Sequence, residues 1–182
     1  MRLFVAVDPP ADVREHLRSH TGPLRDAMPG WRWAPPEQWH LTLAFLGEVA
    51  DERVDELTRR MGLAARRHEP FDLRLGGLGA FSNARRAKVL WAGVEGDRDA
   101  LKALAGSVSA GARRAKIDVD ERRYRPHMTV GRRRDPVDVS DSLGAGYESP
   151  SWRVEEFVLV ESYLGSAVRH EVRDRFRLGR HG

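Results

Sequence analysis

The chain has 182 residues, of which 41% are hydrophobic and 32% are charged, a balance that excludes an intrinsically disordered chain. It has no cysteine, which excludes disulfides and thiolate metal sites. No apolar run is long enough to span a bilayer, which excludes membrane spans. The start of the chain is a poor signal peptide, so the cytoplasm is the expected location. The net charge of +4 comes mainly from arginine, since lysine occurs at only three positions, and by itself it does not identify a nucleic-acid-binding protein.

The first half of the chain predicts a strand, a helix, a second strand and a second helix. Residues 2–7 are an apolar run that ends at Asp8, which is placed to cap the helix that follows. The apolar stripe of this helix begins with Val13 and Leu17, and a proline-rich loop then leads to a strand that contains His40. Residues 51–67 start with acidic side chains and carry apolar residues at helical spacing, which predicts the second helix.

The second half predicts more strands than helices. Residues 71–83 and 87–96 are expected to be strands joined by a polar turn, and residues 97–113 a helix with Asp97 as its cap. A strand over 122–134, a loop rich in Ser, Gly and Asp, and a hairpin of strands over 152–164 and 170–179 complete the chain. This order favours an α+β fold with largely antiparallel sheets. Each half also offers a strand, a helix and a strand with a His-x-Thr motif, which indicates a duplication.

The two His-x-Thr motifs are the most informative feature of the sequence. On a strand, His40 and Thr42 share one face while Leu41 points to the other, and His127 and Thr129 repeat this arrangement in the second half. A single motif of this kind is most simply a histidine at a sheet edge. Two matched copies arise rarely by chance in a chain with seven histidines, so we interpret the pair as functional.

Two imidazoles on facing strands suit acid–base chemistry at phosphorus. One histidine can accept a proton while the other donates one near neutral pH, and each threonine hydroxyl can bind a phosphoryl oxygen. A phosphate held between them could undergo in-line displacement without a metal.

The sequence resembles the two-histidine (2H) phosphoesterase superfamily and, within it, the RNA 2′,3′-cyclic phosphodiesterases, also called 2′-5′ RNA ligases. The resemblance covers almost the whole chain in family order, through "RLFVAVDPP", "HLTLAFLGEV", "LGGLGAFSNARRAKVLWAGV", "RPHMTVGR" and "FVLVESYL". It implies a bilobal α+β fold with pseudo-twofold symmetry, in which two mostly antiparallel sheets flank a central cleft and helices lie outside. It also implies one bilobal domain over residues 1–182 that opens a 2′,3′-cyclic phosphate to a 2′-phosphate without metal or cofactor.

Carried over by position, the resemblance makes His40 and His127 the catalytic pair and Thr42 and Thr129 the phosphate-binding hydroxyls. Our hypothesis is that His40 is the general acid toward the departing 3′ oxygen and His127 the base on the attacking water. Arg132 matches a basic position that follows the second motif. Strict alternation puts it on the face opposite His127, so a bulge at Gly131 is needed for it to reach phosphate.

The chain departs from the family near its end, where "GSAVRHEV" stands in place of the usual GP-x-Y and His170 lies near the tyrosine position. This departure bears on substrate preference. Elsewhere, His16 and His20 have the i, i+4 spacing of metal ligands but lack an accompanying carboxylate motif, so we interpret them as ordinary helix residues.

Aromatic and basic side chains leave further alternatives open. Trp31, Trp33 and Trp39 are expected mainly to pack in the core, although one of them, or Phe81, could stack on a nucleobase. The turn at Arg85 and Arg86 either contacts RNA phosphates or is simply solvated.

The expected partner is an RNA that ends in a 2′,3′-cyclic phosphate, or a small cyclic nucleotide, bound by a monomer. Two alternatives to hydrolysis remain. One is a 2′-5′ RNA ligase that runs the reverse reaction in the same site, and the other is a non-catalytic module that binds RNA ends.

Overall fold

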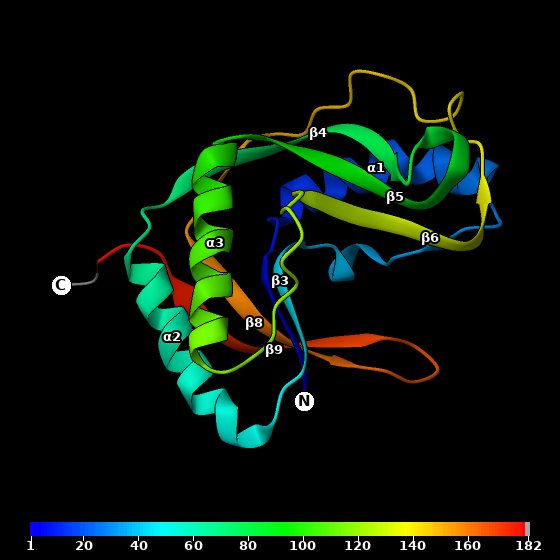
Figure 1. The fold of residues 1–182 in the computed structure, drawn as a ribbon. Helices are drawn as coiled ribbons and strands as arrows, with labels where there is room; N and C mark the ends of the chain where they lie inside the picture. The colour runs from blue at the N-terminus through cyan, green and yellow to red at the C-terminus, as the bar shows by residue number, and fades with distance from the viewer. Residues whose placement is uncertain (181–182) are drawn as a thin grey trace.

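The computed structural model describes residues 1–180 as two lobes built on separate antiparallel sheets (Figure 1). The helices are α1 (Ala11–Ala27), α2 (Val54–Arg66) and α3 (Arg98–Arg114), with short 3₁₀ turns at Pro36–Gln38, Asp51–Arg53 and Ala84–Arg86. The strands are β1 (Arg2–Val7), β2 (Arg32–Trp33), β3 (Leu41–Glu48), β4 (Phe71–Phe81), β5 (Ala87–Gly96), β6 (His127–Val137), β7 (Trp152–Val154), β8 (Glu156–Tyr163) and β9 (Arg169–Arg177).

The strand orders of the two sheets repeat one another. The first sheet runs β3-β1-β8-β9 and the second runs β2-β6-β5-β4-β7. In the first sheet the motif strand β3 pairs with β1, and β1 pairs with β8 from the second half of the chain. In the second sheet the motif strand β6 pairs with β5, and β5 pairs with β4 from the first half. The predicted α+β fold with a pseudo-twofold duplication is therefore confirmed.

The three helices cover the outer faces of the sheets. Helices α2 and α3 pack against each other and contact β9 and β3 of the first sheet, while Figure 1 shows α1 behind the strands of the second sheet. No helix in the described part of the chain is both long and apolar enough to cross a membrane.

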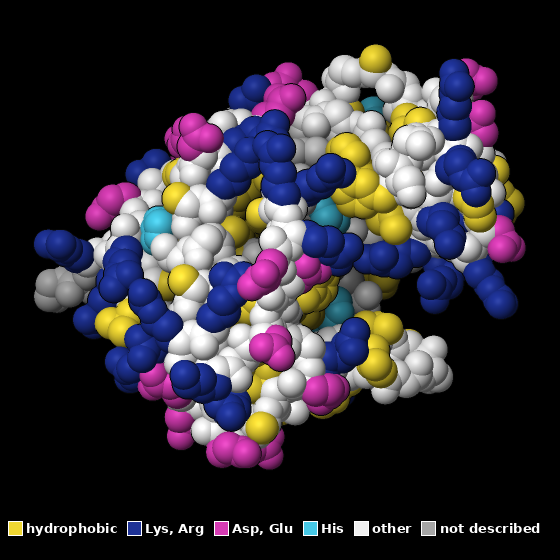
Figure 2. All heavy atoms as spheres, viewed as in Figure 1, with side chains coloured by type: hydrophobic (Ala, Val, Ile, Leu, Met, Phe, Trp, Pro, Cys, Tyr) yellow, Lys and Arg dark blue, Asp and Glu magenta, His cyan; other side chains and the backbone are white. Residues whose placement is uncertain are grey.

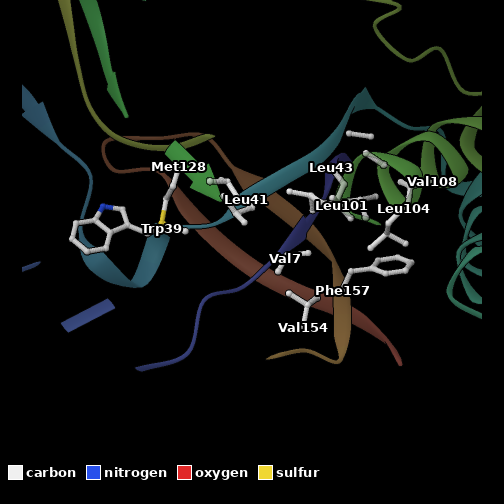
Figure 3. Close-up of a cluster of buried hydrophobic side chains, with 14 of the residues drawn as sticks. Val7, Trp39, Leu41, Leu43, Leu101, Leu104, Val108, Met128, Val154 and Phe157 are labelled. Carbon is white, nitrogen blue, oxygen red and sulfur yellow. The ribbon is translucent and has the colours of Figure 1, made fainter. Parts of the chain in front are cut away.

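One buried cluster joins the backs of both motif strands. Trp39 and Leu41, which flank His40, are 1% and 0% exposed, and Met128, between His127 and Thr129, is 0% exposed. All three belong to the same core, which Figure 3 shows extending to the α3 side chains. Because the apolar neighbours of each histidine are fixed in this core, strand alternation turns the histidine itself to the opposite face.

Three local expectations were wrong. The strand expected over 152–164 is divided at Glu155, so that β7 pairs with β4 in the second sheet and β8 pairs with β1 in the first. Neither aspartate caps its helix through its side chain: Asp8 lies 3.8 Å from Arg14, and Asp97 Oδ2 accepts a hydrogen bond from the Asp72 backbone N–H.

Candidate active site

The two histidines are held in the same way, one in each lobe. The His127 Nδ1 lies 2.7 Å from the carbonyl oxygen of Arg125, and the His40 ring makes the matching hydrogen bond to the Gln38 backbone. A carbonyl oxygen can only accept, so the Nδ1 of His127 donates and its Nε2 is left for chemistry. The hydrogen bond of His40 to the Gln38 backbone raises the pKa of that ring, against the effect of burial. In each case the partner is two residues before the histidine, in the segment that leads into the motif.

His40 lies in an aromatic pocket of the first sheet. Its ring stacks on Phe4 with a centroid separation of 4.6 Å, and the edge of His170 approaches it at 5.3 Å. Burial, followed by the neighbouring His170, lowers the pKa of His40 from its usual value to about 4, so that its ring is neutral at pH 7.

His127 has aromatic neighbours in the second sheet. Phe81 meets its ring edge-on at 4.9 Å, and Trp91 lies 6.5 Å away. Gly79 makes room for the Trp91 indole, because a Cβ at that position would lie 2.3 Å from the ring. Burial is again the main cause that lowers the pKa of His127, and the hydrogen bond to the Arg125 carbonyl opposes this shift.

Arg132 lies on the same face of β6 as His127. Trp91 pairs with Thr129 whereas Leu90 pairs with Gly131, so Val130 is an extra residue that shifts the alternation. The bulge required by the sequence hypothesis is therefore present. The positive charge of Arg132 lowers the pKa of both His40 and His127, which places its guanidinium within electrostatic reach of both rings.

The two motif strands also meet directly. The Tyr124 hydroxyl, from the segment that precedes β6, donates a 2.8 Å hydrogen bond to the backbone oxygen of Thr42 in β3. Both Thr42 and Thr129 are partly exposed on the histidine faces. Figure 2 shows an indentation between the lobes in which histidine side chains lie beside Lys and Arg side chains.

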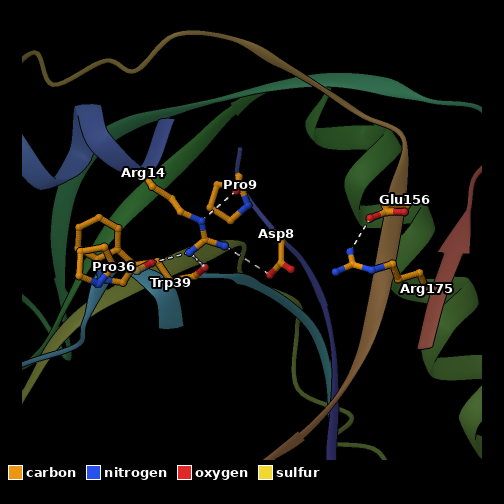
Figure 4. Close-up of polar contacts among 7 residues, drawn as sticks. All are labelled: Asp8, Pro9, Arg14, Pro36, Trp39, Glu156 and Arg175. Carbon is orange, nitrogen blue, oxygen red and sulfur yellow. Dashed lines mark hydrogen bonds and ion pairs between the residues drawn. The ribbon is translucent and has the colours of Figure 1, made fainter. Parts of the chain in front are cut away.

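Arg14 supports the site and was not identified from the sequence. From α1 its guanidinium donates to the carbonyl oxygens of Pro9, Pro36 and Trp39, and it pairs with Asp8 (Figure 4). These bonds fasten the turn that immediately precedes His40. An arginine on a helix surface carries no sequence signal for such a role, because its partners are backbone atoms of a distant loop.

Most other sequence candidates lie away from the histidines. Trp31 and Trp39 are buried in the core, as expected. His16 and His20 contact the Tyr147 ring from α1, and Arg85 and Arg86 are exposed in the turn capped by Asn83.

Comparison with known proteins gives one consistent family. Residues 7–91 match the model described as LigT like Phosphoesterase. The RNA 2′,3′-cyclic phosphodiesterase of Thermus thermophilus is 34% identical over 190 residues, which cover 100% of this chain and 93% of that protein. The crystal structure of TT0787 of the same organism aligns with a TM-score of 0.86 at 33% identity over 100% of both chains. E. coli LigT complexed with 3′-AMP aligns with a TM-score of 0.80 at 28% identity, over 98% of each chain.

Proposed function

The chain belongs to the LigT-like phosphoesterases of the 2H superfamily, and we propose that it hydrolyses RNA 2′,3′-cyclic phosphate ends to 2′-phosphates. The observation that carries the proposal is the matched pair of histidines, each hydrogen-bonded to the backbone of the residue two positions earlier and each with its pKa lowered by the charge of Arg132. An anion between the two rings would meet one acid, one base and one cation.

In the proposed reaction the cyclic phosphate lies between the two lobes. The hydroxyls of Thr42 and Thr129 and the guanidinium of Arg132 bind its non-bridging oxygens. One histidine removes a proton from water as the water oxygen bonds to phosphorus. The other donates a proton to the 3′ oxygen as the P–O3′ bond breaks, which leaves a 2′-phosphate and a 3′-hydroxyl. Proton transfer and charge stabilisation by these groups need no metal.

We assign the general acid to His40 and the general base to His127. Burial lowers the pKa of both rings, so the shifts do not distinguish the two roles. A substrate with sulfur in place of the 3′ oxygen decides between the two, because a thiolate leaves without protonation. The variant that lacks the acid should hydrolyse the sulfur substrate at close to the wild-type rate, while the variant that lacks the base should stay inactive on it.

The function itself is tested with a short RNA that ends in 2′,3′-cyclic phosphate, in the presence of EDTA. We expect turnover by the wild type and a loss of about 10²- to 10⁴-fold in both His40→Ala and His127→Ala. His20→Ala is the matched control, since this histidine packs on Tyr147 outside the site.

Each alternative has its own outcome in this assay. An untouched cyclic end with tight RNA binding would favour the binding module, and loss of turnover with EDTA would contradict the metal-free mechanism. Adding an RNA with a 5′-hydroxyl tests the ligase, which would join the two ends through a 2′-5′ linkage. Mapping of the product as a 2′- or 3′-phosphate identifies the bond that opens.

A further inference from the structure

A third histidine reaches the first His-x-Thr motif from the end of the chain. Val172 of β9 pairs with Val160, and Val160 pairs with Phe4, so these three side chains lie on one face of the sheet. His170 precedes Val172 by two residues in an unbroken register and therefore shares that face. Because Phe4 stacks on His40, this is the face on which the first motif lies.

The rings of His170, Phe4 and His40 contact one another. The edge of the His170 ring approaches Phe4 at 5.0 Å and His40 at 5.3 Å, and both histidines are only partly buried. Each ring therefore remains open to a ligand on this face. Two imidazoles at such a separation can bind different oxygens of one phosphate group.

Gln38 fixes the position of His170 relative to His40. The Gln38 backbone hydrogen-bonds the His40 ring, and its side-chain Nε2 donates a 2.7 Å hydrogen bond to the carbonyl oxygen of Val168. Val168 and Leu164, at the tip of the β8–β9 hairpin, are 43% and 66% exposed, so the tip has little packing of its own. One residue thus ties the hairpin that carries His170 to the turn that leads into His40.

The charges near His170 leave its ring free to take up a proton. Burial lowers the pKa of His170, and the charge of Asp8, at the end of β1, opposes this shift. Asp8 also lies 3.8 Å from Arg14, and the other titratable ring on this face is His40. On the same strand, Arg169 lies over a tyrosine ring and alternation directs it to the opposite face. His170 is therefore mostly neutral at pH 7 in the free protein, and an anion bound beside it favours the protonated form.

We propose that His170 is a third phosphate-binding residue, which becomes protonated as it binds an oxygen of the phosphate group held between His40 and His127. The proposal rests on the proposed function, because that function places the phosphate beside these two histidines. Protonation on binding gives a charge-assisted hydrogen bond to the phosphate. Binding through His170 should therefore be stronger in mild acid than in mild base.

Calorimetry with adenosine 2′-monophosphate, which has the chemistry of the proposed product, tests this role. His170→Gln should weaken Kd by about tenfold at pH 6 and by less than about twofold at pH 8. Ionisation of the ligand itself is common to both proteins, so the ratio of the two Kd values at each pH isolates the contribution of position 170. His16→Gln, on α1, is the matched control and should leave Kd unchanged at both pH values.

NMR titration of the His170 ring protons follows the proton directly. The pKa of His170 should be higher in the complex with adenosine 2′-monophosphate than in the free protein. The role is overturned if this pKa does not change on binding, or if His170→Gln leaves Kd unaltered. It is also overturned if the variant weakens Kd equally at pH 6 and pH 8, as the loss of a merely structural ring would.

The same measurements separate this proposal from the proposed function. A wild-type protein that leaves the cyclic phosphate intact but shows the pH-dependent difference in Kd would not be the proposed hydrolase. His170 would nevertheless be a phosphate-binding residue. Conversely, normal hydrolysis with no difference in Kd would overturn the role of His170 alone.

Discussion

His40 and His170 lie with their ring centroids 5.3 Å apart, although β3 and β9 are the two outermost strands of the first sheet. Phe4 contacts both rings, at 4.6 Å from His40 and 5.0 Å from His170. The sheet therefore curls enough to bring a third imidazole to the site. Since two neighbouring imidazoles repel when both are charged, each protonation state affects the other.

Replacing His170 should change the titration of His40 directly. In His170→Gln we expect the pKa of His40 to rise from about 4, because the charged neighbour is lost, while burial still keeps it below its usual value. NMR titration of the histidine ring protons measures this shift. His16→Gln, on α1, is the matched control and should leave the His40 titration unchanged, and an equal shift in both variants would contradict the contact.

Arg132 should matter to both histidines at once. Arg132→Met should lower kcat/KM for a cyclic phosphate by about 10²-fold, because a cation is lost from the site of the developing charge. It should also raise the pKa of His40 and of His127, since the charge of Arg132 lowers both. Arg133→Met is the control, because Arg133 lies over the Trp31 ring instead. Equal losses in the two variants would remove the specific role of Arg132.

The partly buried His40 should make the protein less stable in acid. Its pKa in the folded state is about 4, below the value of about 6.5 expected when unfolded, so the unfolded chain binds the proton first as pH falls. His40 therefore costs no unfolding free energy well above pH 6.5, and its cost grows as the pH falls from 6.5 to 4. At pH 5 the unfolding free energy is lower by about 2 kcal/mol because of His40.

Urea unfolding of the wild type and of His40→Gln, each at pH 7.5 and pH 5, isolates this contribution. The wild type should lose more unfolding free energy between the two pH values than the variant does. Equal losses would mean that His40 titrates normally in the folded protein.

Arg14 should support both stability and the position of His40. Arg14→Ala removes hydrogen bonds to three backbone carbonyls, which we expect to cost about 2 kcal/mol of unfolding free energy and to lower kcat about tenfold. Arg18→Ala on the same helix breaks an exposed pair with Glu15 and should leave the unfolding free energy and kcat nearly unchanged. Denaturant unfolding and steady-state kinetics compare the two variants. A stable Arg14→Ala variant with normal kcat would show that the turn before His40 holds without it.

Strand alternation alone predicts much of the site. The apolar Leu41 and Met128 go to the core, so His40 and His127 must face away from it, and this is how the structure places them. Alternation fails at Arg132, because a bulge depends on the register of the neighbouring strand, which local sequence does not specify.

The division of residues 152–164 is a second feature that the sequence does not reveal. The buried residues Trp152 and Val154 alternate with exposed ones, and after Glu155 and Glu156 a new buried run begins at Phe157. This change of phase marks a break, but it does not specify which sheet each part joins. The change of sheet follows from which partner strands are already in place, β4 for β7 and β1 for β8. Such a choice depends on contacts between residues distant in sequence.

At Glu155 the chain passes from the second sheet to the first, so the last strands of the chain complete the sheet of the first motif. The sheet that positions His40 takes two of its four strands, β8 and β9, from the last part of the chain. A chain truncated after Glu155 would therefore keep the first motif but lose half the strands of its sheet. The exchange runs both ways, since β4 of the first half lies in the sheet of His127. Each sheet therefore depends on strands from both halves of the chain, and neither half holds a complete sheet of its own.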